Sequence, residues 1–160
     1  MPKIILILHN IRSTYNVGSI FRSAEGFGVE KIICSGYTPY PTFNGDTRLP
    51  HIAEKLTKQI HKAALGAETM VPFEHYENVD SWLEINKFPL IALEQSPSSV
   101  DLRKYKPPSE FALLLGEEVN GIATPILTLA RDIVEIPMFG KKESFNVSVA
   151  AGIALFYLAA

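Results

Sequence analysis

Apolar residues gather in short runs along this chain, and polar segments and helical repeats separate the runs. Lys3–His9 contains five consecutive aliphatic residues, a pattern typical of a strand that is buried on both faces of a parallel sheet. Lys31–Ser35 and Phe111–Leu115 have the same character. Between the first two runs, apolar residues follow helical spacing at Val17, Ile20, Phe21, Ala24 and Phe27. The pattern predicts a strand, a helix and a second strand, with Asn16 as the helix cap and Gly28 as its stop.

The alternation of strands and helices continues along the rest of the chain. Further helices are expected at Glu54–Leu65, Val79–Asn86 and Thr124–Arg131, and further strands at Glu68–Tyr76, Pro89–Glu94 and Ile133–Ile136. Threonine is expected to cap the helix at Thr124, with Pro125 in its first position. The proline-rich segments Gly36–Pro50 and Ser96–Ser109 are expected to be loops. We therefore predict an α/β fold with a mostly parallel sheet and helices on both faces, in a single domain over residues 1–160.

The last predicted helix, Val147–Ala160, contains no charged residue. A helix at the surface of a protein normally has one polar face, and this helix has almost none. Either other elements or a partner chain must cover it on all sides. Since symmetric dimers are the commonest oligomers, we expect a homodimer.

Composition narrows the function classes. The 160 residues are 47% hydrophobic and 20% charged, as in an ordinary globular protein. The net charge of −2 gives no sign of nucleic-acid binding, so an RNA ligand would need a local basic patch. The single cysteine, Cys34, lies in an apolar run and is expected in the core. No apolar run reaches the ~18 residues of a membrane span, and the N-terminus has the pattern of a strand and not of a signal peptide, so we expect a cytoplasmic protein with no membrane partner.

Several common enzyme motifs are missing from the sequence. It has no phosphate-binding P-loop, no dinucleotide fingerprint, no zinc-protease helix and no nucleophile elbow. The four histidines are scattered without the spacing of metal ligands, and no metal is expected.

Three other segments carry candidate chemistry. In Asn16–Arg22, Gly18 and Arg22 lie one helical turn apart, which leaves room beside the arginine for a ligand. A capped helix with a solvated arginine explains the same residues.

The second segment, Leu113–Gly121, runs from a buried strand into a turn with two glycines and two carboxylates. Ligands of open α/β sheets bind beyond the carboxyl ends of strands, although an ordinary strand-to-helix turn has the same composition. The third segment, Glu143–Ala150, has three small polar residues at the start of the apolar helix, more than capping requires: Ser144, Asn146 and Ser148.

Taken in this order, the three segments resemble the three motifs of the SpoU family within the SPOUT superfamily. The matching residues are Asn16, Gly18 and Arg22 in the first motif, Gly116, Glu118 and Gly121 in the second, and Ser144, Asn146, Val147, Ser148 and Ala150 in the third. The resemblance extends from about Ile7 to Leu158. Phe145 stands where the family usually has leucine, and these 160 residues include no flanking RNA-binding extension of the kind that many members carry.

The resemblance implies an S-adenosylmethionine-dependent methyltransferase that modifies a ribose 2′-hydroxyl of tRNA or rRNA. It implies a homodimer and a C-terminal trefoil knot, a rare exception to unknotted topology. The cofactor is expected in three loops of the knot, bound by Leu93, Leu115, Gly116, Ile136, Met138, Ser144, Phe145 and Asn146. The sulfonium is a good leaving group, so the chemistry needs no metal.

The resemblance also assigns catalytic roles. Arg22 is expected to act on the ribose hydroxyl. An arginine stays protonated, so we expect it to clamp an RNA phosphate and polarise the hydroxyl instead of acting as a free base. Asn16 is expected to position Arg22 or the ribose, and Glu118, Ser144 and Asn146 to hold the site together. Basic residues that are candidates for RNA contact are Arg12, Arg22, Arg48, Lys55, Lys58 and Lys62.

Three alternatives stay open at this point. The chain is an inactive relative that binds RNA or cofactor only, a methyltransferase with a different acceptor, or a flavodoxin-like nucleotide binder. Failure to bind S-adenosylmethionine would favour an inactive relative that binds RNA or only dimerises, and the acidic balance lends some weight to a different acceptor. The third explains the alternating pattern but leaves the Glu143–Ala150 segment unexplained.

Overall fold

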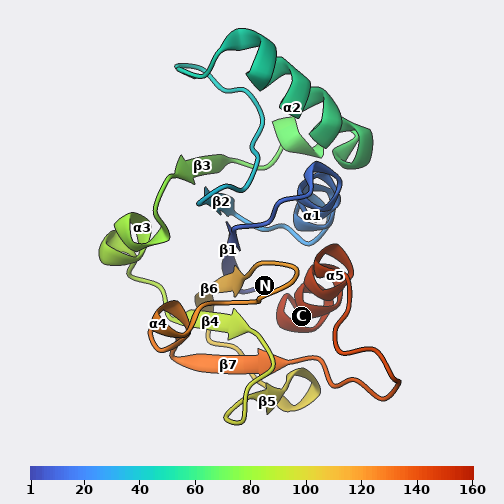
Figure 1. Ribbon diagram of the computed structural model, residues 1–160. Coiled ribbons are helices and arrows are strands. Elements are labelled where there is room, and N and C mark those ends of the chain that lie inside the picture. The colour runs from blue at the N-terminus through green and yellow to red at the C-terminus, as the bar shows by residue number, and fades with distance from the viewer.

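Seven strands form one parallel sheet in the computed structural model, which describes residues 1–160 (Figure 1). The strand order is β3-β2-β1-β6-β4-β7-β5. The strands are β1 (Lys3–His9), β2 (Lys31–Ser35), β3 (Phe73–Tyr76), β4 (Leu90–Leu93), β5 (Val100–Asp101), β6 (Glu110–Leu115) and β7 (Asp132–Glu135). The helices are α1 (Thr14–Gly26), α2 (Pro50–Ala64), α3 (Val79–Ile85), α4 (Thr124–Leu127) and α5 (Val147–Leu158), with short 3₁₀ helices η1 (Ala67–Thr69) and η2 (Leu102–Lys104). The predicted α/β class is confirmed.

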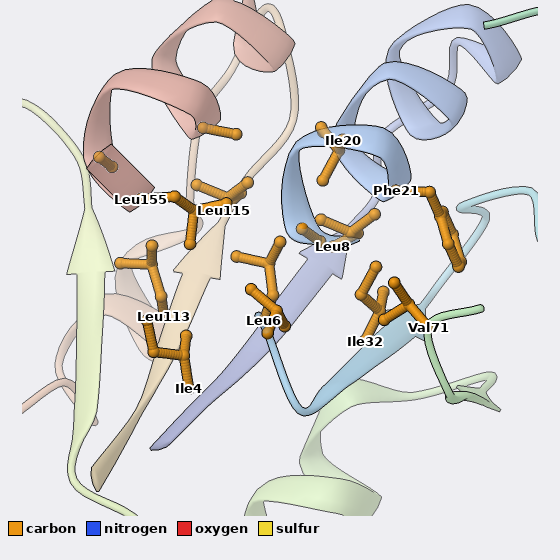
Figure 2. Packing of buried hydrophobic residues seen from close by; sticks show 14 of the residues in the cluster. Ile4, Leu6, Leu8, Ile20, Phe21, Ile32, Val71, Leu113, Leu115 and Leu155 are labelled. Carbon is orange, nitrogen blue, oxygen red and sulfur yellow. The ribbon is translucent and has the colours of Figure 1, made fainter. Parts of the chain in front are cut away.

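Each face of the sheet has its own hydrophobic core. Successive strand residues point to opposite faces, so Leu6 and Leu8 of β1 join one core while Ile5 and Ile7 join the other. The larger core lies under α1 and α5, and Figure 2 shows Ile20, Phe21 and Leu155 packed over the strands. The smaller core lies under α3 and α4 on the opposite face (Figure 1). Helices therefore cover both faces, as the uninterrupted aliphatic runs predict.

Helix α1 differs from its predicted form at its start. It begins at Thr14, and Ser13 is the cap because its side chain accepts a hydrogen bond from the Asn16 N–H at 3.1 Å. The prediction that Asn16 caps the helix is therefore wrong. Gly28 follows the helix with φ of +67°, a left-handed conformation that favours glycine, so the predicted stop is confirmed.

Gly18 lies where α1 crosses α2. A Cβ atom at this position would lie 2.3 Å from the Ile60 carbonyl oxygen of α2 and 3.0 Å from the Ala63 Cβ. The glycine is buried and lets the two helix backbones approach each other. The expectation that Gly18 leaves room for a ligand beside Arg22 is wrong, because the α2 backbone takes that space.

The other differences concern element ends. Helix α2 begins at Pro50 instead of Glu54, and the residue before α4 is Ala123, so Thr124 does not cap that helix. Of the predicted strand Glu68–Tyr76 only Phe73–Tyr76 is extended, and β5 and η2 lie within the Ser96–Ser109 segment that was expected to be a loop. These are short elements whose ends depend on tertiary packing more than on local pattern.

The Gly36–Pro50 loop is ordered by one arginine. The Arg48 guanidinium donates hydrogen bonds to the Asp46 carboxylate and to the carbonyl oxygens of Tyr40 and Pro41, and it lies 3.7 Å from the centre of the Tyr40 ring. The hydrogen bond from Arg48 lowers the pKa of Asp46 to about 2.

Cys34 of β2 is fully buried as predicted, and burial raises the pKa of its thiol to about 12.

Helix α5 is covered on one side only. Ala151, Ala154 and Leu155 are fully buried against α1 and the sheet, whereas Val149 is 49% exposed and Phe156 is 65% exposed. The apolar face that was expected to need cover thus remains open within one chain. None of the helices, the longest of which has 15 residues, has the length and apolar character for crossing a membrane.

The helix crossing at Gly18 yields a stability prediction. Gly18→Ala is expected to lower the free energy of unfolding by about 1–3 kcal/mol, because the new methyl group collides with the α2 backbone. Gly26→Ala on the same helix has open space around its Cβ and is expected to raise stability by up to about 1 kcal/mol. Urea denaturation of both variants measures the difference. Equal stability of the two would contradict the crossing described here.

Candidate active site

The three candidate segments meet at the carboxyl ends of the strands. β1 and β6 are parallel neighbours, with Leu8 paired with Leu115, so the chain leaves both strands at the same edge of the sheet. The segment before α1 follows β1, and the Gly116–Gly121 turn follows β6. This edge is where open α/β sheets bind ligands.

Glu118 joins the first segment to the second. Its carboxylate accepts hydrogen bonds from the backbone N–H of Arg12 at 3.3 Å and of Ser13 at 3.4 Å, and from the Asn16 side-chain amide at 3.4 Å. Asn16 is 6% exposed, so its amide is held between α1 and this carboxylate. Asn16 and Glu118, which the family resemblance places in the site, are therefore in direct contact.

The turn after β6 is closed by a hydrogen bond within it and is held in place by a residue that follows β4. Gly121 donates to the Glu117 carbonyl oxygen at 3.0 Å and has φ of +68°, which favours glycine. The Glu94 carboxylate, directly after β4, accepts a hydrogen bond from the Ile122 N–H at 2.9 Å. A Cβ at Gly116 would lie 2.5 Å from Ile122, so only glycine fits between strand and turn.

The third segment begins α5. Asn146 caps the helix, and its side-chain oxygen accepts hydrogen bonds from the Ser148 N–H at 2.9 Å and from the Ser148 hydroxyl at 2.6 Å. Gln95, after β4, donates from its side-chain amide to the Glu143 carbonyl oxygen at 2.7 Å. The loops after β4 and before α5 are thereby connected.

A cleft of about 420 Å³ opens between these loops. Its lining is made of the segments 93–95, 115–122, 135–136 and 143–145, with Leu127, Val147 and Ala150. The lining combines aliphatic side chains with five glutamates and contains no lysine, arginine or histidine. A cleft lined by aliphatic groups and carboxylates suits a ligand that has both an apolar ring and a positive charge.

Two titratable groups lie near the glutamates of the cleft. His9, at the end of β1, has its pKa lowered by burial and shares a hydrogen bond of 3.0 Å with the Ser35 hydroxyl. Partial burial and then the Glu117 carboxylate raise the pKa of Tyr37. At neutral pH both groups are therefore uncharged.

Most of the expected cofactor-binding residues line the cleft: Leu93, Leu115, Gly116, Ile136, Ser144 and Phe145. Met138 and Asn146 lie on the neighbouring segment but are outside the lining. Arg22 is exposed on α1, and its side chain makes no hydrogen bond or ion pair within the chain. It is also outside the lining of the cleft. The sequence patterns do not single out Glu94 and Gln95 as site residues, although both are polar residues directly after a buried strand.

The Glu118 contacts yield a second prediction. Glu118→Gln replaces an accepting oxygen by a donor that faces N–H groups, so we expect unfolding free energy to fall by about 1–2 kcal/mol. Hydrogen exchange of the amides at residues 12–16 is expected to accelerate. Glu84→Gln on the exposed side of α3 is the matched control and is expected to change stability by less than about 0.5 kcal/mol. Indistinguishable behaviour of the two variants would show that Glu118 does not hold the start of α1.

Known proteins are similar to this chain in sequence. The chain is 27% identical over 158 residues to a 23S rRNA (guanosine-2′-O-)-methyltransferase RlmB of Coxiella burnetii, covering 97% of this chain and 57% of that protein. It is 29% identical to a tRNA (guanosine(18)-2′-O)-methyltransferase of Aquifex aeolicus, covering 96% and 67%. The chain thus spans a little over half the length of the RlmB relatives.

A solved structure and a family model show the same similarity as these relatives. An AdoMet-bound rRNA methyltransferase from Sinorhizobium meliloti superposes with a TM-score of 0.77 at 25% identity, over 97% of this chain and 55% of that one. The model of the SpoU rRNA Methylase family matches residues 3–156, which include all three segments. The chain therefore belongs to the SpoU methylase family.

Proposed function

We propose that this chain transfers a methyl group from S-adenosylmethionine to a ribose 2′-hydroxyl of tRNA or rRNA. The observation that supports this most directly is that the second and third motif segments line one cleft at the carboxyl edge of the sheet, and that Asn16 of the first motif is hydrogen-bonded to Glu118 in its lining. The names of the curated relatives, which include both rRNA and tRNA 2′-O-methyltransferases, point in the same direction. We propose a single catalytic domain over residues 1–160, working in the cytoplasm.

The cleft fits S-adenosylmethionine by its chemistry. Its aliphatic lining suits the adenine ring, and its glutamates suit the two positive charges of the molecule, the sulfonium and the ammonium group. When bound, S-adenosylmethionine supplies an electrophilic methyl group on a sulfur that leaves as a neutral thioether. The backbone at Leu93, Leu115 and Ile136 and the segment Ser144–Asn146 would hold it, with Met138 near the edge of the cleft.

The chain's own residues orient the acceptor. Arg22 is exposed on α1, and a guanidinium binds phosphate oxygens well, so Arg22 is suited to clamp an RNA phosphate and polarise the adjacent 2′-hydroxyl. Asn16 and Glu118 hold the start of α1, Ser144 lines the opposite wall, and Asn146 caps α5 beside it. As the methyl group is transferred, the hydroxyl proton passes to an oxygen of the RNA phosphate that Arg22 clamps and from there to water.

We also propose that the working unit is a homodimer. The exposed apolar face of α5 lies beside α1, with the Phe27 and Phe156 rings 6.4 Å apart at their shared edge. A second copy on this face would bury it and would bring Arg22, which lies outside the cleft of its own chain, toward the cleft of the other copy. The C-terminal trefoil knot remains part of this proposal, supported by the family and by the Gln95–Glu143 contact between loops.

Methyl transfer gives the direct test of this function. The purified protein is incubated with labelled S-adenosylmethionine and either unfractionated tRNA or ribosomal RNA, and nucleosides are identified by mass spectrometry. We expect a 2′-O-methylated nucleoside, and a loss of at least about a hundredfold in rate with Arg22→Ala. Lys87→Ala, another exposed cation, is the control and should retain the rate. Label on a base would instead support a methyltransferase with a different acceptor, and cofactor binding without any transfer would support an inactive relative.

A shared active site gives a further test. Arg22→Ala and Asn146→Ser are each expected to be inactive, although serine retains the ability to cap α5. If the dimer places Arg22 at the other copy's cleft, mixing the two variants after reversible dissociation restores about a quarter of wild-type activity, because half of the dimers are mixed and have one intact site. No recovery in a mixture shown to contain mixed dimers would mean that each site uses one chain only.

A further inference from the structure

A row of unpaired lysines runs along α2. Lys55, Lys58 and Lys62 are spaced by three and four residues and therefore share one face of the helix. All three are exposed, none forms an ion pair, and together with His51, Glu54 and Gln59 they line a shallow groove. Lys3, Lys31, Arg48, Arg103 and Arg131, by contrast, all have acidic partners. We call Lys55, Lys58 and Lys62 the α2 lysine face.

A second hollow adjoins this groove. Its volume is about 630 Å³, and Gln59 lines both it and the groove. Tyr37 is 47% exposed in this hollow, and the Arg12 guanidinium lies 5.5 Å from the centre of its ring. We call this the Tyr37 hollow. It therefore presents an aromatic ring and an unpaired arginine side by side.

The Tyr37 hollow has a rigid frame. The Tyr37 N–H donates to the Asn10 side-chain oxygen at 3.1 Å, and the neighbouring Tyr40 ring is stacked between His75, at 4.0 Å, and Arg48, at 3.7 Å. Because the Tyr37 backbone and the neighbouring Tyr40 ring are already held in place, this part of the hollow loses little conformational freedom when a ligand binds. Glu77 is the one acidic residue that lines the Tyr37 hollow.

The Tyr37 hollow also adjoins the cleft of the candidate active site. The Arg12 backbone N–H is bonded to Glu118, and the pKa of Tyr37 is raised by partial burial and then by the nearby Glu117 carboxylate, which lines the cleft. The order across the surface is thus the cleft, the Tyr37 hollow and the α2 lysine face.

We propose that this surface docks the single-stranded part of the RNA substrate: Tyr37 and Arg12 stack an unpaired base next to the methylated nucleotide, and the α2 lysine face contacts the phosphates that follow. This rests on the proposed function, since it places the substrate of that same cleft. Aromatic rings beside arginine bind unpaired bases without regard to sequence, and lysines that follow a backbone add a salt-dependent attraction. A protein of net charge −2 can bind RNA in this way because the positive charge is local.

The experiment compares two triple variants of equal charge in the full chain. Lys55→Gln/Lys58→Gln/Lys62→Gln removes the α2 lysine face, and Lys87→Gln/Lys104→Gln/Lys106→Gln removes three exposed lysines that line neither the groove nor the Tyr37 hollow. Filter binding of unfractionated tRNA is measured between 50 and 200 mM salt, a range of about fourfold. Over this range the slope of log affinity against log salt reports the number of phosphate contacts. The first variant is expected to flatten the slope of log affinity against log salt by about 2, and the control to leave it unchanged.

Tyr37 is tested in the same assay. Tyr37→Ala is expected to weaken tRNA binding by about tenfold, while Tyr37→Phe, which retains the ring, binds as the wild type does. Calorimetry with S-adenosylmethionine should give the same affinity for every variant. Equal slopes for the two triple variants, or equal binding by the two Tyr37 variants, overturns the docking surface even if methyl transfer is found. Selective loss of tRNA binding in a protein without methyl transfer supports the docking surface and contradicts the proposed function.

Discussion

The parallel pairing of β1 with β6 is the constraint on which the rest of the molecule depends. It places two strands from distant parts of the sequence in register at the centre of the sheet, so that the chain leaves both at one edge. Both strands are buried on both faces, which requires helices on each side and fixes where α1 and α5 lie. The Glu118 contacts to the start of α1 exist only because of this pairing.

The site is held together mainly by carboxylates and amides that bind backbone groups. Glu118 accepts from the turn before α1, Glu94 from the turn after β6, and Gln95 donates to the loop before α5. Each contact joins two loops, so the cleft is shaped by loops that hold one another. Loops fixed in this way can present backbone groups to a cofactor without a glycine-rich phosphate loop.

Charge on this protein is separated in space. Glutamates gather in the cleft, where a cationic cofactor fits, and unpaired lysines gather on α2, where a polyanion fits. The nearly neutral total therefore conceals two surfaces of opposite character. The exposed apolar face of α5 is a third surface, and its character is neither acidic nor basic.

The sequence by itself determined the class of the fold, because aliphatic runs and helical repeats reflect burial at each position. It also marked the three motif segments, whose order along the chain carried the family resemblance. Only the tertiary structure decided that Gly18 serves the α1–α2 crossing, that Arg22 lies outside its own cleft, and that Glu94 and Gln95 bridge loops. These facts depend on which backbone approaches a residue from a distant part of the chain, and a local pattern contains no information about that neighbour.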